Sequence, residues 1–224
     1  MERWDAQGNV YLVGDPFGAT PDRVRELVGD ADGILEVSPS GEVTIWNPDG
    51  SRAEMSGNGT RIAAAWLAVR TGADEVTVVT GGRTVRVLAR GSDLWEQEVG
   101  DVRVGAAEEL EGVRFVPVDV GNPHAVVAGD PAELPRIGPL LETHPRFPER
   151  TNVQVAQVEA PGRIRARVWE RGAGETASSG SSAVAVAAVL GGDGETVVEF
   201  RGGELRVRIE DGRAVLIGPA VRRD

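Results

Sequence analysis

Short stretches in which β-branched and polar residues alternate run through most of the chain, separated by glycine, aspartate and proline. Such alternation is typical of β-strands with one buried face. It predicts twelve strands, at residues 10–13, 33–37, 43–47, 75–79, 84–89, 114–118, 124–128, 153–158, 164–170, 196–200, 204–209 and 214–217.

Two alanine-rich stretches interrupt this pattern, at residues 61–69 (RIAAAWLAV) and 183–190 (AVAVAAVL), and each is followed by glycine. Beyond Arg61 both are apolar on nearly every side, which predicts buried helices rather than surface helices. Thr20 and Pro21 predict the start of a third, short helix that ends near Val28. Two buried helices among many strands indicate sheets wrapped around central helices.

The two halves of the chain repeat one another. Trp46 and Ser56–Gly57 return 123 residues later as Trp169 and Ser179–Gly180, and Gly8–Asn9 returns 113 residues later as Gly121–Asn122. The common order is strand, turn, strand, then Ser-Gly at the start of a buried helix. We therefore predict an α/β protein of the α+β type with two pseudo-symmetric halves, residues 1–111 and 112–224. Each half is expected to be a curved mixed or antiparallel sheet around its helix.

Composition excludes several kinds of chemistry. All 24 basic residues are arginine, against 35 acidic residues, and the chain has no lysine, no cysteine and two histidines. Without lysine there is no Schiff base or Walker A lysine, and without cysteine no thiolate nucleophile, disulfide or iron–sulfur cluster. The net charge of −11 argues against nucleic acid and anionic membranes as partners.

The sequence also lacks signals for metal binding and for export. No spacing is typical of metal ligands, so we predict no metal. No stretch approaches 18 consecutive apolar residues, and the N-terminus lacks the apolar core of a signal peptide. We therefore predict a cytoplasmic protein.

Two glycine-rich turns carry the candidate chemistry, at residues 47–61 and 169–183. Each leads into a helix N-terminus, where free backbone N–H groups and the helix dipole favour an anion. Taken singly, each turn is better explained as an ordinary capped helix start, since serine and asparagine are the usual cap residues. As a symmetric pair, with Glu170, Arg171 and Glu175 nearby, they favour a shared anion site in which the two turns face each other across a cleft.

The motifs resemble those of the diaminopimelate epimerase family. They are NPDGSRAEMSGNGTR at residues 47–61, GNPH at 121–124 and ERGAGETASSG at 170–180. The likeness runs nearly from end to end. It implies an isomerase that epimerises or racemises an amino acid by two-base proton exchange at the α-carbon, without a cofactor, as in the conversion of LL- to meso-diaminopimelate. It further implies a small-molecule substrate in amino-acid and lysine biosynthesis, and leaves a homodimer open.

The resemblance also implies roles for individual residues. Ser56 and Ser179 occupy the positions of two cysteines that exchange the proton, and His124 and Glu170 are the candidate bases beside them. The residues implied in substrate binding are Asn9, Asn47, Gly57, Asn58, Asn122, Asn152, Glu170, Arg171, Gly180 and Ser181.

The serines depart from the family pattern, because a hydroxyl is far less acidic than a thiol and needs an adjacent base. Three explanations stay open. The chain is a natural serine variant with weaker or altered chemistry, a form in which both cysteines have been replaced, or a relative of changed function. Such a relative would be a non-catalytic amino-acid-binding protein, or a dehydratase or isomerase that uses a carboxylate.

Overall fold

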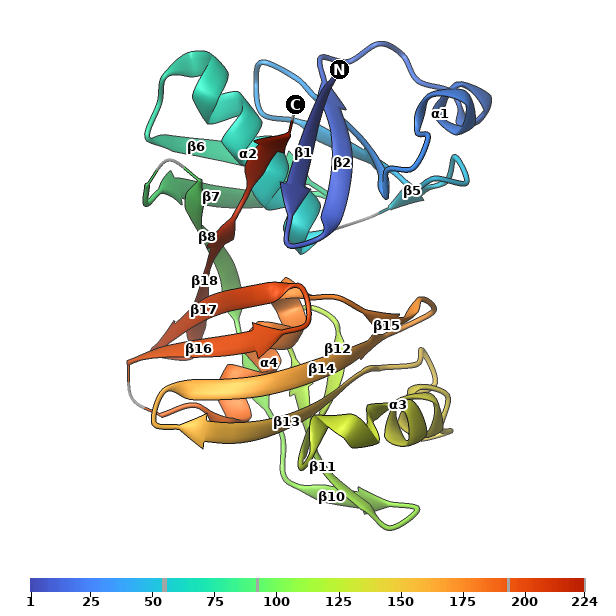
Figure 1. The fold of residues 1–224 in the computed structure, drawn as a ribbon, viewed down its shortest axis with the longest axis vertical. Helices are drawn as coiled ribbons and strands as arrows, with labels where there is room; N and C mark the ends of the chain where they lie inside the picture. The colour runs from blue at the N-terminus through green and yellow to red at the C-terminus, as the bar shows by residue number, and fades with distance from the viewer. Residues whose placement is uncertain (54–55, 92, 193, 224) are drawn as a thin grey trace. The chain divides into compact units, whose positions relative to one another are not determined.

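A computed structural model describes residues 1–53, 56–91, 93–192 and 194–223. The chain divides into two compact units (Figure 1). Unit 1 comprises Met1–Glu98 and Ile217–Asp224, and unit 2 comprises Val99–Leu216. No helix in the described ranges is long and apolar enough to cross a membrane.

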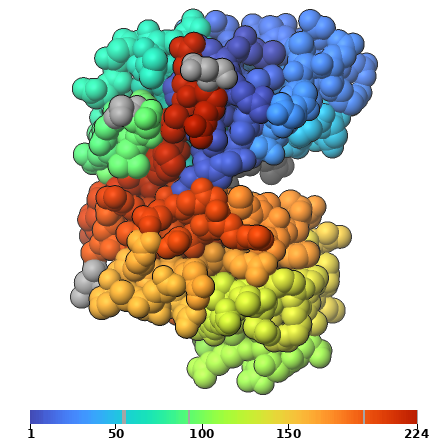
Figure 2. All heavy atoms as spheres, viewed as in Figure 1, coloured from blue at the N-terminus to red at the C-terminus, as the bar shows by residue number. Residues whose placement is uncertain are grey.

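Unit 1 is built on a six-stranded sheet in the order β19-β1-β2-β3-β4-β5. Its strands are β1 (Glu2–Ala6), β2 (Asn9–Gly14), β3 (Gly33–Val37), β4 (Val43–Trp46), β5 (Arg52–Ala53) and β19 (Val221–Arg223). Only β2 and β3 are parallel to each other in this sheet. A second set follows, with β6 (Glu75–Thr80), β7 (Arg83–Ala89) and the first part of β8 (Leu94–Asp101). Figure 2 shows the C-terminal residues, in red, beside the blue N-terminal strands, as the pairing of β19 with β1 requires.

A long helix fills the core of unit 1. Helix α2 (Gly57–Thr71) is buried from Asn58 to Ala68 and packs on the sheet face that carries Tyr11, Leu35 and Ile45. The short helix α1 (Pro21–Leu27) covers the opposite face. Because both faces are covered, all five residues of β3 are buried.

Unit 2 repeats this plan with longer strands. Its strands are β9 (Arg103–Val104), β10 (Glu108–Leu110), β11 (Val113–Asp119), β12 (Pro123–Ala128), β13 (Asn152–Ala160), β14 (Arg163–Glu170), β15 (Gly174–Thr176), β16 (Glu195–Phe200), β17 (Gly203–Glu210) and β18 (Arg213–Pro219). They pair in the order β10-β11-β12-β13-β14-β16-β17-β18, while β15 pairs with β14 and β9 with β11. The pairs β12–β13 and β14–β16 are parallel.

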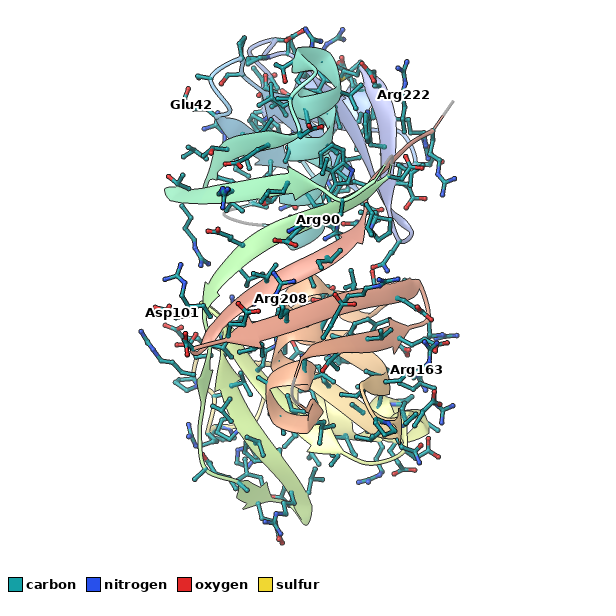
Figure 3. All side chains as sticks on the ribbon, turned by 90° about the vertical axis from the view of Figure 1, so that its left-hand side faces the viewer. Glu42, Arg90, Asp101, Arg163, Arg208 and Arg222 are labelled. Atoms are coloured by element: carbon teal, nitrogen blue, oxygen red, sulfur yellow. The ribbon has the colours of Figure 1, made fainter. Side chains whose placement is uncertain are left out.

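Helix α4 (Gly180–Leu190) packs on one face of this sheet. Helix α3 (Leu134–Glu142), preceded by the 3₁₀ turn η1 (Pro131–Glu133), packs on the other. In Figure 1 the strands β13, β14, β16 and β17 pass in front of α4. Among the labelled side chains, Glu42 and Arg222 project outward from unit 1 and Arg163 from unit 2 (Figure 3).

The two units share one element order. The series β1-β2-α1-β3-β4-β5-α2-β6-β7-β8 returns as β11-β12-α3-β13-β14-β15-α4-β16-β17-β18. The second series begins at Val113, beside the boundary at 111 and 112 that we predict for the halves. The compact units have different bounds, because β8 runs on into unit 2, β18 runs back into unit 1 at Ile217, and the last strand, β19, pairs with β1.

The predicted α+β fold, with sheets around buried central helices, is confirmed. All twelve predicted strands and all three predicted helices are present, although α2 and α4 begin three or four residues before the predicted starts. The elements that the pattern did not predict are β1, β5, β8, β9, β10, β15, β19, η1 and α3.

Candidate active site

Ser56 caps the first turn of α2 in unit 1. Its backbone is extended, and its Oγ accepts a hydrogen bond of 3.0 Å from the Gly59 N–H. The Tyr11 hydroxyl, on β2, donates a second hydrogen bond of 3.2 Å to the same oxygen. Because Ser56 Oγ accepts two hydrogen bonds, its own hydroxyl proton is left to be donated.

Ser179 occupies the equivalent cap position of α4 in unit 2, but its surroundings are different. It is buried, with 5% of its surface exposed, and its side chain makes no capping hydrogen bond to the helix. Instead the Ser179 hydroxyl lies beside the carboxylate of Glu170, and this polar contact offsets part of the rise in the pKa of Glu170. Ser179 is therefore coupled to a proton acceptor, whereas Ser56 is not.

Glu170 lies at the end of β14, opposite Gly174 of β15. Thr176, on β15, donates a hydrogen bond of 2.6 Å to Glu170 Oε1. Burial raises the pKa of Glu170 above its usual range, and the hydroxyls of Thr176 and Ser179 offset part of that rise. A carboxylate with a raised pKa is a stronger base than an ordinary one, which suits it to accept a proton.

His124 lies on β12 with 1% of its surface exposed. Its Nε2 is 2.9 Å from Asn122 Oδ1, and its Nδ1 is 2.9 Å from Nε2 of Gln154 on β13. Gln154 Nε2 also donates to the Ser182 hydroxyl on α4. Burial lowers the pKa of His124 to about 3, so the ring is neutral at physiological pH. Both ring nitrogens of His124 are hydrogen-bonded to other side chains. The proton acceptor beside Ser179 is therefore Glu170 and not His124.

Asn152 and Arg171 form a second contact between motifs in unit 2. Asn152 Nδ2 donates to the Pro123 carbonyl, and its Oδ1 accepts from the Arg171 backbone N–H. The Arg171 guanidinium donates to the Glu149 carbonyl and is otherwise exposed. Asn152 thereby joins the strand that carries His124 to the turn that follows Glu170.

The remaining predicted site residues are placed as follows. Gly57–Asn58 and Gly180–Ser181 form the first turns of α2 and α4. Asn9 begins β2, and Asn47 follows β4, where its side chain donates to Ser51 Oγ. The residues Glu54 and Met55 of the first motif lie outside the described part of the chain. That the two Ser-Gly turns face each other stays a prediction.

Several residues of these networks are absent from the sequence-based set. They are Tyr11, Glu142, Gln154, Thr176 and Ser182. Glu142 accepts hydrogen bonds from the Trp169 indole and the Gly172 N–H, which fixes the turn after Glu170. One signal could have found Tyr11: it precedes His124 by 113 residues, the spacing that relates Asn9 to Asn122. Within residues 1–53, 56–91, 93–192 and 194–223, no three His, Asp or Glu side chains group as metal ligands.

Comparison with known proteins places these motifs in a family. The family model described as diaminopimelate epimerase matches residues 116–223. A diaminopimelate epimerase of Xylella fastidiosa (strain M12) is 37% identical over 95% of this chain and 90% of that protein. One from Methanothermobacter thermautotrophicus is 36% identical over 92% of this chain and 88% of its own length. The chain belongs to the diaminopimelate epimerase family.

Solved structures at lower identity share the fold of this family member. A predicted epimerase of Pseudomonas aeruginosa superposes with a TM-score of 0.70 at 19% identity, covering 100% of this chain and 96% of the other. A hydroxyproline epimerase of Agrobacterium vitis, solved with trans-4-hydroxy-L-proline bound, gives 0.64 at 15% identity, covering 99% and 88%.

Proposed function

We propose that the chain is an amino-acid epimerase that inverts the α-carbon of diaminopimelate by proton transfer, without a cofactor. Membership of the family supports the reaction class, and the names of the relatives support the substrate. One structural observation carries the proposal for this chain in particular. The Ser179 hydroxyl, at the position where the family resemblance implies a cysteine, lies beside the buried carboxylate of Glu170.

This contact supplies the base that a serine needs. In the proposed step, the α-proton passes to Ser179 Oγ while the hydroxyl proton of Ser179 passes to the carboxylate of Glu170. Ser179 is unchanged after the step, and Glu170 has become a carboxylic acid. The raised pKa of Glu170 favours this transfer, because it brings the pKa of the acceptor, Glu170, closer to that of the donor, the Ser179 hydroxyl.

Ser56 is suited to the opposite role, the delivery of a proton. Its oxygen accepts from Gly59 and Tyr11, so its hydrogen is the group it can offer. After Ser56 gives its proton to the α-carbon, the Tyr11 hydroxyl replaces that proton and solvent water reprotonates the tyrosinate. Glu170 releases the proton it gained to solvent, which closes the cycle. Tyrosine has an ordinary pKa near 10, so this route is slower than one based on a thiol.

Substrate binding is proposed for the residues that the family pattern indicates. The backbone N–H groups of Gly57–Asn58 and Gly180–Ser181 lie at helix N-termini, where they stabilise a carboxylate. Polar side chains would hold the amino and distal groups of the substrate, from Asn9, Asn47, Asn122, Asn152 and Arg171.

The proposal is tested by incubating the protein with LL-diaminopimelate and separating the stereoisomers by chiral chromatography. We expect slow formation of the meso isomer, and a rate at least about a hundredfold lower in Glu170→Gln, as for loss of a general base. Ser179→Ala should be equally slow. Thr176→Val is the matched control, because it removes a hydrogen bond to Glu170 but keeps the base. Saturable binding without turnover would support the amino-acid-binding alternative.

Restoring the thiols gives a second test of the serine positions. A thiol has an ordinary pKa near 8.5 and forms a thiolate far more readily than serine forms an alkoxide. Ser56→Cys combined with Ser179→Cys should raise the rate by orders of magnitude, and each single change should do much less. A folded, reduced double variant no faster than the parent would remove both serines from the acid–base assignment.

A further inference from the structure

Helix α2 carries a fully buried arginine whose charge has no counter-ion among the described residues. Arg61 is 0% exposed, and no carboxylate in the described part of the chain pairs with it. Its Nε donates to the Pro219 carbonyl at 2.9 Å and its Nη2 to Asn58 Oδ1 at 3.0 Å, while Nη1 has no hydrogen-bond partner among the described residues. Burying an unpaired charge lowers the stability of the folded state, so a buried arginine of this kind points to a role other than stabilisation.

The cation remains charged at physiological pH. Desolvation lowers the pKa of Arg61 to about 10, still well above neutrality. Its guanidinium contacts Asn58, which lies in the first turn of α2, two residues after Ser56. The positive charge therefore lies at the same end of the helix as its positive dipole end.

The equivalent helix of unit 2 has the opposite electrostatics. Position 184, which is 123 residues after Arg61, is a buried valine. Near the α4 cap stands the carboxylate of Glu170, and the position equivalent to Glu170 in unit 1 is the neutral Asn47. The repeat thus pairs Ser56 with a buried cation and Ser179 with a carboxylate.

We propose that Arg61 is a positioning residue that makes the first turn of α2 an anion-stabilising end. It fixes the side chain of Asn58 and adds its charge to the helix dipole. It thereby favours the binding of a carboxylate by the Gly57 and Asn58 N–H groups. It also favours the deprotonated form of the side chain at position 56, such as the thiolate of an introduced cysteine. That this carboxylate belongs to the substrate rests on the proposed function, whereas the electrostatic effect on position 56 does not.

The other buried charged side chains in the described part of unit 1 have partners away from the start of α2. Tyr11, on β2, faces Ser56 as a neutral hydroxyl donor. The buried carboxylate of β3, Glu36, accepts from the Trp46 indole and from backbone N–H groups of residues 17 and 19. The other buried carboxylate, Glu96 on β8, pairs with Arg90. Among the described buried charged side chains of unit 1, Arg61 alone contacts the first turn of α2.

The chain has no cysteine, so a single introduced thiol reports the local field without background. The thiolate pKa in Ser56→Cys can be measured from the pH dependence of its ultraviolet absorbance and of its alkylation rate. We expect a pKa below the ordinary value near 8.5. Adding Arg61→Met should raise it by about one unit or more, and adding Arg61→Lys should raise it much less.

Ser179→Cys is the matched control. The pKa of its thiol should lie above that in Ser56→Cys, because a carboxylate disfavours a thiolate. It should fall in the Glu170→Gln background and respond less to Arg61→Met.

An unchanged thiol pKa in a folded Ser56→Cys, Arg61→Met protein would overturn the inference and leave Arg61 as a structural tie between α2 and residue 219. Should Arg61→Met fail to fold, Asn58→Asp provides a second test, because it gives Arg61 a counter-ion of the same shape as asparagine. We expect it to raise both the melting temperature and the thiol pKa in Ser56→Cys, and a change in neither would also overturn the inference. A thiol pKa in Ser56→Cys that rises on Arg61→Met, in a protein without epimerase activity, would support this inference and contradict the proposed function.

Discussion

The buried histidine of unit 2 predicts a specific loss of stability in mild acid. His124 has 1% of its surface exposed, and its ring is bonded at both nitrogens to Asn122 and Gln154. Burial lowers the pKa of His124 to about 3, whereas an unfolded histidine has a pKa near 6.5. Between these values the unfolded chain binds a proton that the folded chain does not.

The sign and size of the effect follow from this difference. Because the folded pKa is depressed, the stabilising contribution of neutral His124 is fully present above about pH 6.5 and is lost as the pH falls toward 3. Each pKa unit corresponds to about 1.4 kcal/mol, so the free energy of unfolding falls by about 2 kcal/mol by pH 5 and by about 4 kcal/mol near pH 3.

Urea unfolding between about pH 7.5 and 5, followed by circular dichroism, measures this slope. His124→Gln keeps a group that can hydrogen-bond at both ends but cannot gain a charge in this range. The variant is expected to be less stable at neutral pH and to lose the histidine-dependent slope. The difference between the two pH profiles isolates His124 from the carboxylates, whose contributions are common to both proteins.

His144→Gln is the matched control, since it removes the other histidine, which is only half-buried in a loop. Its pH profile should follow that of the parent. Parallel profiles for the parent and His124→Gln from about pH 7.5 to 5, or a ring that titrates near 6.5 in the folded protein by NMR, would refute the reasoning.

Three further predictions concern stability, each measured by thermal or urea unfolding of the purified variant. Gly33→Ala should cost about 1–3 kcal/mol, because its Cβ would overlap the Trp46 carbonyl; an unchanged melting temperature would contradict this packing. Ser56→Ala should cost about 1 kcal/mol through loss of the helix cap, and Ser179→Ala clearly less, because Ser179 makes no capping bond; equal losses would contradict the difference. Glu170→Gln should be more stable than the parent at neutral pH. Because its pKa is raised in the folded protein, Glu170 stabilises the fold when the pH is below the pKa of the unfolded chain, and this contribution is lost as the pH rises through the folded pKa. A Glu170→Gln protein less stable than the parent at neutral pH would contradict this prediction.

The sequence predicts much of this fold because the two central helices have unusual sequences. Residues 62–68 and 183–187 are apolar on every side, and the structure buries them in the two cores. The strands show clear alternation where one face is exposed. These signals depend only on local sequence, so they can be read without knowing what packs against them.

The elements that could not be predicted depend on tertiary contacts. Helix α3 contains Gly138 and Pro139, which ordinarily argue against a helix. Gly138 is required there because a Cβ would lie 2.8 Å from the Trp169 ring. Strand β8 buries Glu96 and Gln97 next to each other, so it shows no alternation.

The same limit applies to the candidate site. The motifs identify Ser56, Ser179 and Glu170, since glycine-rich turns before helices have a recognisable sequence. They do not show which serine contacts the carboxylate, because that depends on the pairing of β14 with β15 and on the cap geometry of α4. Nor do they show that Arg61, part of the first motif, is buried without a counter-ion in the part of the chain that the structure describes.

The central claim is that this protein exchanges the α-proton of an amino acid. Proton NMR of LL-diaminopimelate incubated with the protein in heavy water tests it most directly, with Glu170→Gln measured in parallel. We expect the α-proton signal to decay as deuterium is incorporated and the meso isomer to appear, with both processes at least about a hundredfold slower in Glu170→Gln. Saturable binding of the amino acid with no loss of the α-proton signal would contradict the account.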